Sequence, residues 1–452
     1  MTKHLDRLGP SAQILLSFLL VILAGGVLLR LPFSCAAGHA VSWIDAFFLS
    51  TSAVCVTGLA SVDIGTTLSL PGQWILLALI QVGGVGLMVL SSFIFILFHQ
   101  QVSLKQRHII QGTYTSANAI TIRALLRIVI FYMVVIEGAG ILCLFPVFLH
   151  DFPFPRAAWL SLFHSVSAFC NAGFSPLPQN LLPYRYHVWL NLVIMGLIIV
   201  GGIGFSVLWE ALQAWKQRQQ RFRFSLNAKI VLVTTFALIL GGALALWLLE
   251  WRNPTLEDGT RLQRLLPAFF QSVTARTAGF NTVDMASLRD DSIVVLLFLM
   301  FVGASPGSCG GGIKTTTFAI LCLTFWNRMR GIQRTRVAGR VLPDEQVVRA
   351  TVIFMFSVAL LFVFSGLLVF FNTSLCVSGR GHWLDALFES TSAISTVGLS
   401  LGITPYLNSV CKFLIILLMY FGRVGLLTLV YQMMSKDRRE PFEYAEEGIM
   451  VG

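Results

Sequence analysis

The chain has 452 residues, of which 56% are hydrophobic and only 12% are charged, and its mean hydropathy is +0.78. Soluble globular proteins carry about 25% charged residues. The composition therefore excludes a disordered chain, an ordinary soluble enzyme and a protein that binds nucleic acid through a solvated basic surface. It is typical of a polytopic membrane protein, in which the position of the net charge of +11 carries information.

Eight stretches are long and apolar enough to cross a bilayer, since a transmembrane helix needs about 20 mostly apolar residues. They are 11–29, 74–98, 128–149, 188–209, 230–249, 293–326, 350–371 and 413–434. No small-residue cleavage site follows the apolar core of the first stretch, so we expect a retained helix rather than a signal peptide.

A shorter apolar stretch lies between the two members of each pair, at 43–57, 157–172, 262–278 and 383–397. Each has about 15 residues, which is too short to span and is typical of a re-entrant segment. The chain therefore repeats a helix, a half-segment and a helix four times. The predicted repeats are 1–100, 101–220, 221–340 (with a glycine-rich, broken inner helix) and 341–452 (with a C-terminal tail).

The basic residues follow the same plan. Of the 32 Lys and Arg residues, 20 lie in the termini and in the segments that join one repeat to the next. Short loops rich in Lys and Arg stay in the cytoplasm, so we expect both termini inside and the half-segments to enter from outside. Orientation and contact with anionic lipid account for these loops, and docking of a cytoplasmic partner is the alternative.

The half-segments contain an internal repeat. Aligned without gaps on one glycine, they read FLSTSAVCVTGL (48–59), FHSVSAFCNAGF (163–174), FFQSVTARTAGF (269–280) and FESTSAISTVGL (388–399). Each begins with Phe ten residues before the shared glycine, and hydroxyl or small residues recur between them: Ser50, Ser52, Ser165, Ser167, Thr274, Ser390 and Ser392. Ordinary helix C-caps would explain the glycines, but capping does not require the shared spacing upstream.

Physical chemistry suggests what these segments do. Non-helical backbone at membrane depth is tolerated only where it is buried in protein or lines an aqueous cavity. A ring of converging carbonyl oxygens replaces the hydration shell of a monovalent cation, and glycine permits that convergence because it has no Cβ. The predicted fold class is thus all-α and polytopic, with four tandem helix–pore loop–helix repeats around a pseudo-fourfold pore and eight transmembrane helices.

On these motifs the chain resembles the Trk/Ktr/HKT superfamily of potassium transporters. Its length, its eight spans and the tail from Glu446 to Gly452 are most similar to the KtrB-type membrane subunits of Ktr systems. The resemblance implies a selectivity filter made of Val56, Thr57, Gly58, Asn171, Ala172, Gly173, Thr277, Ala278, Gly279, Thr396, Val397 and Gly398. Only the fourth triplet reproduces the Thr-Val-Gly of potassium channels.

The resemblance also implies a cellular role. It implies that K⁺ is taken up across the cell (inner) membrane, by symport or in the thermodynamically permitted direction. Na⁺ is a further candidate ion, and no nucleotide is expected on this chain. The expected partners are a second copy of the chain, with the C-terminal tail at the dimer interface, and a cytoplasmic nucleotide-binding ring of the KtrA type. The alternative is a secondary solute or cation transporter with inverted repeats. The four repeats run in one orientation, which argues against this alternative.

A gate is predicted in the third repeat, where residues 303–317 interrupt the inner helix with Pro306 and several glycines. Glycine and proline disfavour a helix, and broken helices mark gating sites in transporters. The spacing from Gly307 to Lys314 nearly matches a phosphate-binding loop, but that loop requires a soluble βαβ setting. The gate residues we predict are Gly310, Gly311, Gly312, Lys314 and Arg423.

Three buried charges invite interpretation, because a charge within a span is costly and indicates function. By the resemblance, Arg423 lies near the loop that obstructs the cavity under the filter; it would hold the loop, set the cavity potential or act as a plain tether. Arg276 is expected to brace the filter from behind, since a cation facing the pathway would repel K⁺. Glu137 is either a buried hydrogen-bonding acid or a helix-interface residue. The glycine pairs of the other inner helices predict close packing.

No nucleophile–base motif and no metal-ligand spacing of Cys or His occurs in the sequence, so we expect no enzyme and no resident metal centre.

Overall fold

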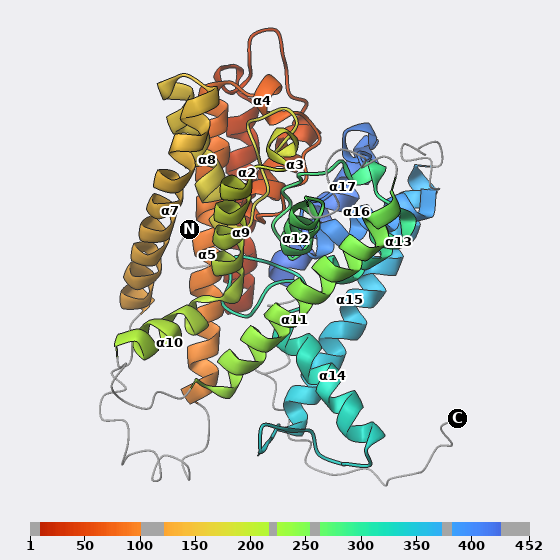
Figure 1. The fold of residues 1–452 in the computed structure, drawn as a ribbon. Helices are drawn as coiled ribbons and strands as arrows, with labels where there is room; N and C mark the ends of the chain where they lie inside the picture. Colours follow the sequence, from red (N-terminus) through yellow and green to blue (C-terminus); the bar gives the residue numbers. More distant parts are fainter. Residues whose placement is uncertain (1–9, 101–121, 217–223, 254–262, 373–381, 426–452) are drawn as a thin grey trace.

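Helices account for most of the structure (Figure 1), a computed structural model that describes residues 10–100, 122–216, 224–253, 263–372 and 382–425. The α-helices are α2 (Pro10–Arg30), α3 (Trp43–Val54), α4 (Ile64–Thr67), α5 (Leu70–Gln100), α7 (Ile122–Asp151), α8 (Phe154–Phe169), α9 (Val188–Ile203), α10 (Phe205–Lys216), α11 (Leu226–Leu249), α12 (Leu265–Thr274), α13 (Asp290–Phe301), α14 (Thr315–Met329), α15 (Asp344–Phe371), α16 (His382–Ile394) and α17 (Ser409–Tyr420).

Short elements complete the described part of the chain. They are the 3₁₀ turns η1 (Pro32–Ser34), η2 (Leu182–Tyr184), η3 (Glu250–Arg252), η5 (Met285–Ser287) and η6 (Thr404–Tyr406), the π-helical η7 (Phe421–Gly425), and the antiparallel strands β1 (Arg336–Val337) and β2 (Arg340–Val341). This content confirms the predicted all-α class.

The long helices have the composition of membrane spans. Among the described residues, three helical stretches are long and apolar enough to cross a bilayer singly: Arg127–Asp151, Leu226–Leu249 and Asp344–Phe371. The pair α9 and α10 passes the same test together, and Leu15–Arg30 and Leu70–Gly86 are shorter apolar helices. The chain is therefore a multi-pass membrane protein, and the count of eight spans stays a prediction.

Each half-segment helix packs on the long helix that precedes it in the chain: α3 on α2, α8 on α7, α12 on α11 and α16 on α15. A buried serine anchors three of these pairs by donating to a carbonyl oxygen of the long helix. The bonds are Ser50 Oγ to Ile22 O (2.7 Å), Ser165 Oγ to Glu137 O (2.7 Å) and Ser272 Oγ to Ile239 O (2.8 Å). Glycines at the contact, Gly25, Gly140 and Gly242, let the helices approach closely.

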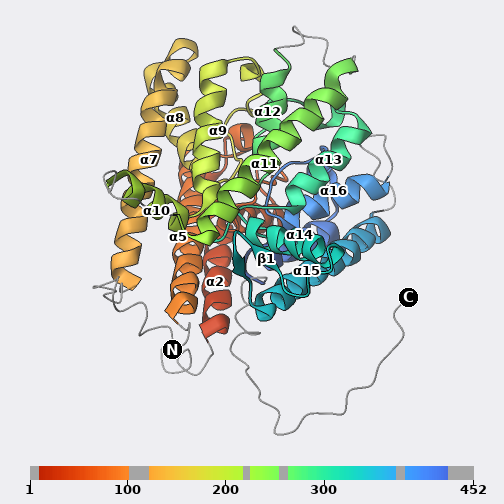
Figure 2. The same cartoon turned by 60° about the horizontal axis from the view of Figure 1, so that its bottom comes forward.

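The span predicted for residues 188–209 is sharply bent. Helix α9 ends at Ile203, and the chain turns by 103° into α10. Gly204 has a φ of +97°, and a Cβ there would overlap the carbonyl oxygen of Pro306, while Phe205 N donates to Gly307 O (2.9 Å). A segment of the third repeat thus stands where α9 would continue, and α10 lies beside α5 and α11 instead (Figures 1 and 2).

The ungapped alignment of the third half-segment is also wrong by one residue. Phe48, Phe163 and Phe388 are fully buried, but in the third copy the fully buried ring is that of Phe270, and Phe269 is only partly buried. The anchoring serine agrees: Ser272 lies seven residues before Gly279, whereas Ser50 and Ser165 lie eight residues before Gly58 and Gly173. One residue fewer therefore separates the anchored part of the helix from the glycine in this copy, which sequence spacing concealed because two Phe residues are adjacent.

Candidate functional site

The four segments that follow α3, α8, α12 and α16 share one backbone path. In each, the residue two positions before the glycine has a positive φ: Val56 (53°), Asn171 (60°), Thr277 (78°) and Thr396 (51°). The glycines follow with φ values of 96°, 67°, 80° and 93° for Gly58, Gly173, Gly279 and Gly398. A non-glycine residue with positive φ is uncommon, so its recurrence at four aligned positions indicates one repeated turn.

The four turns meet one another in chain order. A Cβ placed on Gly58 would overlap the carbonyl oxygen of Ala172. The same relationship joins Gly173 to Ala278, Gly279 to Val397, and Gly398 back to Thr57. Each glycine therefore faces the carbonyl of the residue before the next glycine, and the fourth turn closes on the first. Only glycine fits at these positions, because any side chain would displace the neighbouring backbone.

Hydrogen bonds from the helix ends hold the turns. Serine hydroxyls in the first and fourth copies accept from the glycine itself, with Gly58 N to Ser52 Oγ at 3.1 Å and Gly398 N to Ser392 Oγ at 3.0 Å. In the second and third copies the hydroxyl instead donates past the glycine, from Ser167 Oγ to Phe174 O (2.9 Å) and from Thr274 Oγ1 to Phe280 O (2.7 Å). The hydroxyl therefore accepts from the glycine N–H in the first and fourth turns, and donates to the carbonyl of the residue after the glycine in the second and third turns.

The break in the third inner helix lies directly against these turns. We name residues 302–314, between α13 and α14, the glycine-rich loop. Gly311 N donates to Thr396 Oγ1 (3.0 Å), and a Cβ on Gly310 would overlap Thr277 Oγ1. Gly312, with a φ of +69°, would place a Cβ 3.2 Å from the Cβ of Ser395. The three successive glycines let the loop approach residues of the third and fourth turns.

The other repeats also hold the loop. Cys309 N donates to Gly201 O (3.2 Å) and Ser305 N donates to Gly202 O (3.0 Å), which ties the loop to α9. The guanidinium of Arg423 is 1% exposed and donates to the carbonyl oxygens of Cys309 and, at 3.3 Å, of Gly83 in α5. The loop is therefore bonded directly to α9 and to Arg423 of η7, and through Arg423 to α5.

Lys314 lies at the end of the loop, and its ammonium donates to Gly310 O (2.6 Å). Lys314 and Arg423 thus bind carbonyl oxygens of adjacent loop residues. The carbonyl groups of Cys309 and Gly310 are therefore held in place, because each accepts a hydrogen bond from a cationic side chain. All five predicted gate residues, Gly310, Gly311, Gly312, Lys314 and Arg423, are brought together.

The glycines of the other inner helices serve close packing. A Cβ on Gly83, Gly201 or Gly422 would overlap the carbonyl oxygen of the last residue of the half-segment helix in the same repeat. Those residues are Val54, Phe169 and Ile394. In the third repeat the corresponding Gly303 meets Gly311 of the loop instead, so the loop takes the place that a helix end has elsewhere.

The other two buried charges bond mainly to the long helices: Arg276 to α11, and Glu137 to α5 with a further contact from Cys170 Sγ of the second turn (3.9 Å). Arg276 is 7% exposed, and its guanidinium donates to the carbonyl oxygen and hydroxyl of Thr235 in α11, both at 3.4 Å. Glu137 is 6% exposed and accepts from Gln81 Nε2 at 3.0 and 3.2 Å, which joins α7 to α5. Glu137 is therefore both a buried hydrogen-bonding acid and a helix-interface residue, which are the two roles that the sequence left open.

Sequence reasoning missed a polar position on the half-segment helices. The residue after the buried phenylalanine is Leu49, His164, Gln271 or Glu389. His164 bonds Ser175 Oγ through Nε2 (2.9 Å), and Glu389 accepts from Thr404 Oγ1. Both side chains are fully buried, and both fasten the segment that follows the turn. The corrected alignment of the third copy would have revealed this position.

Sequence reasoning also missed an ion pair between the first and last repeats. Lys412 Nζ of α17 lies 2.7 Å from Asp45 Oδ1 of α3, and the two side chains are 11% and 14% exposed. The pair joins residues 367 positions apart in the chain, which no local pattern could indicate. Among the described residues no group of three or more His, Cys, Asp or Glu side chains could hold a metal ion.

Apolar helices, buried non-helical backbone and four converging turns define an all-α membrane transport protein. A family model agrees with this class: residues 15–439 match TrkH, described as "Cation transport protein". The chain therefore belongs to the TrkH family, within the Trk/Ktr superfamily and most like its KtrB-type members. Proteins of this family are ion transporters and not enzymes.

Individual relatives cover nearly the whole chain. It is 35% identical over 448 residues to "Potassium/sodium uptake protein NtpJ" of Enterococcus hirae, which covers 99% of this chain and 98% of the relative. It is 36% identical over 448 residues to "Ktr system potassium uptake protein B" of Bacillus subtilis, with 99% and 97% covered. The crystal structure of the potassium transporter TrkH from Vibrio parahaemolyticus has the same fold, with a TM-score of 0.71, 21% identity and coverage of 94% and 84%.

Proposed function

We propose that this chain is the ion-translocating subunit of a Ktr-type potassium uptake system. In the proposed fold, eight transmembrane helices form four repeats (1–100, 101–220, 221–340 and 341–452) around a pseudo-fourfold pore. The observation that carries the proposal is the closed series of contacts in which each of the four glycines faces the carbonyl of the next turn. Such a series is what a ring of ion-coordinating carbonyls requires.

The proposed filter consists of the twelve residues from Val56 to Gly58, Asn171 to Gly173, Thr277 to Gly279 and Thr396 to Gly398. Its carbonyls would replace water around a monovalent cation, and the C-terminal ends of α3, α8, α12 and α16 would add negative dipole ends. The printed names of the relatives from Enterococcus hirae and Bacillus subtilis support K⁺, and the former also supports Na⁺ as a further ion.

The glycine-rich loop is the proposed gate. Its glycines contact Thr277 and Thr396, so in this conformation it would obstruct the pathway next to the filter. Arg423 and Lys314 stabilise that conformation through the carbonyls of Cys309 and Gly310. Opening requires these bonds to break, which makes the loop a two-state element rather than a fixed plug.

The proposed assembly places both termini and the basic inter-repeat loops in the cytoplasm. It includes a homodimer and a nucleotide-binding ring of the KtrA type, and the names of the Ktr relatives support partnership with further Ktr components. Part of the basic loops, Lys105 and Arg107 among them, and the tail from Glu446 to Gly452 lie outside the described residues. The dimer contact is therefore proposed from the resemblance alone.

Flux of radiolabelled rubidium into liposomes that contain the purified protein tests the proposal. Gly58→Ser should reduce flux at least tenfold, because its side chain would displace the carbonyl of Ala172. Gly366→Ser is the matched control, since a Cβ at Gly366 meets no atom within 4 Å, and it should transport like the wild type. Absent flux, or flux that ignores Gly58→Ser, would favour the alternative of a secondary transporter without a channel-like filter.

A further inference from the structure

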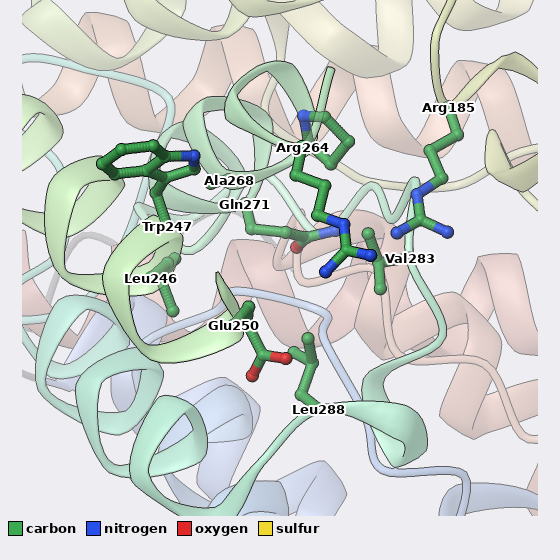
Figure 3. Close-up of a pocket in the computed structure, with 10 residues that line it drawn as sticks. Arg185, Leu246, Trp247, Glu250, Arg264, Ala268, Gln271, Val283 and Leu288 are labelled. Carbon is green, nitrogen blue, oxygen red and sulfur yellow. The ribbon is translucent and has the colours of Figure 1, made fainter. Parts of the chain in front are cut away.

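A pocket lies away from the four turns, at the end of α11 and the start of α12 (Figure 3). Leu246 and Trp247 form an apolar wall, and Arg185, Glu250, Arg264 and Gln271 contribute polar groups. Figure 3 shows the Gln271 amide and the two guanidinium groups turned toward the same space. Arg185 comes from the loop before α9, so the pocket lies between two predicted repeats.

Gln271 is the unusual group in this pocket. Its side chain is 3% exposed, and in the described part of the chain neither its Oε1 nor its Nε2 has a hydrogen-bond partner. The residues at the equivalent position, His164 and Glu389, are both hydrogen-bonded. Buried polar groups are nearly always paired, so an unpaired amide that faces a pocket indicates an occupant with both a donor and an acceptor.

The two arginines are also left with capacity to bind. Within the described ranges, Arg264 donates from Nη1 to Trp251 O (3.3 Å), and its buried Nε has no partner there. The guanidinium of Arg185 lies 5.1 Å from the ring centre of Tyr186, and its buried Nε likewise has no partner in the described part of the chain. Among the described residues, no carboxylate lies within 4.0 Å of either guanidinium.

Glu250, the acid of the pocket, is bonded elsewhere. Its Oε1 accepts from Arg289 N (2.9 Å) and its Oε2 accepts from Asn253 Nδ2. The polar lining therefore carries one positive charge in excess, together with unused N–H donors. Planar guanidinium groups match the oxygens of phosphate and carboxylate groups.

We propose that this pocket binds a phosphate group, either free inorganic phosphate or the headgroup of an anionic phospholipid. Arg185 and Arg264 hold the anionic oxygens, and Gln271 Nε2 donates to a further oxygen. A hydroxyl of monoprotonated phosphate, or of a phosphatidylglycerol headgroup, donates to Gln271 Oε1. Leu246 and Trp247 provide an apolar wall that suits the adjoining part of a lipid.

The position of the pocket fits both sources. It lies where the span α11 ends, and Trp247 packs edge to face on Trp251 with ring centres 4.5 Å apart. Tryptophan is enriched at the depth of lipid headgroups. In the proposed topology this end of α11 faces the outside, so the pocket lies on the side of an extracellular anion and of the outer leaflet.

Direct binding measurements test the proposal without reference to transport. The purified, detergent-solubilised full chain is titrated calorimetrically with inorganic phosphate and, in a second arm, with dioctanoyl phosphatidylglycerol. We expect saturable binding of at least one probe. Arg264→Gln should weaken it at least tenfold by removing a cation from the pocket. Gln271→Glu, which keeps the shape but adds a negative charge, should weaken it at least as much.

Arg156→Gln is the matched control, because Arg156 is an exposed cation near the start of α8 and does not line the pocket. It should bind either probe like the wild type. Saturable binding of phosphate identifies a free anion, and binding of the lipid alone identifies a headgroup. Binding of neither probe, or binding that Arg264→Gln and Gln271→Glu leave unchanged, would overturn the proposal and leave water as the occupant. Rubidium flux of the same variants reports separately on the proposed function.

Discussion

Arg423 donates a hydrogen bond to the backbone carbonyl of Cys309, which lies 114 positions earlier in the chain. The side chain is 1% exposed. The same guanidinium donates to Gly83 O, so a single buried cation in η7 links the glycine-rich loop to α5. Burying a charge is costly unless the charge is hydrogen-bonded, and the two carbonyl oxygens that accept from Arg423 help to offset that cost.

Arg423→Ala should increase rubidium flux, because it removes two hydrogen bonds that hold the loop closed. Hydrogen bonds to charged groups contribute about 1.5–3 kcal/mol each, so we expect an increase of about tenfold or more in liposome flux assays. Arg349→Ala is the control, since Arg349 is a partly exposed cation (19% side-chain exposure) that pairs with the exposed Glu345 within α15. Equal flux in wild type and Arg423→Ala would show that Arg423 is a structural tether and does not hold the gate closed.

Shortening the glycine-rich loop should also increase flux. Deletion of Gly311 and Gly312 removes the residues that contact Thr396 and Ser395, so the loop would no longer reach the fourth turn. Deletion of Ala338 and Gly339, in the tight turn between β1 and β2, is a matched control of equal length. A correctly folded loop deletion with unchanged or lower flux would contradict a gating role.

Glu389→Leu should lower the selectivity for rubidium over sodium severalfold. Glu389 accepts from Thr404 Oγ1 and so fastens the segment that follows Gly398. Losing a buried hydrogen bond of this kind costs about 1–3 kcal/mol, which lets the fourth turn relax. Glu389→Gln keeps an acceptor for Thr404 and should retain selectivity, measured by competition between the two ions. If Glu389→Leu discriminates between rubidium and sodium as well as the wild type does, Glu389 does not support the proposed filter.

The Asp45–Lys412 pair should contribute measurable stability. We expect a double-mutant cycle of Asp45→Asn and Lys412→Met to give a coupling free energy of about 1–3 kcal/mol in thermal unfolding, since residues in contact couple in this range. The exposed Arg289–Asp291 pair, at 48% and 60% side-chain exposure, is the comparison and should couple by less than about 1 kcal/mol. Coupling no greater than that of the exposed pair would show that the buried pair does not fasten the repeats.

Much of the fold could be predicted because it rests on local composition. Lengths of apolar stretches decide that the chain enters a membrane as helices, and the four copies of one motif indicated where non-helical turns interrupt it. The resemblance brought Arg423 and the loop together in expectation, whereas their bonding partners could not be predicted. A side chain that reaches the carbonyl of Cys309 or Gly83 leaves no trace in the spacing of either residue.

The sequence by itself determined a membrane-embedded helical chain with four copies of one turn motif, because hydropathy and the spacing of small residues act within a few turns of chain. Only the tertiary structure decided the bend at Gly204, the Asp45–Lys412 pair and the pocket that Gln271 lines. Each depends on atoms supplied by a distant segment: Pro306 against Gly204, Lys412 against Asp45, and Arg185 in the same pocket as Gln271. Close packing between repeats set these features, since two segments cannot occupy the same space.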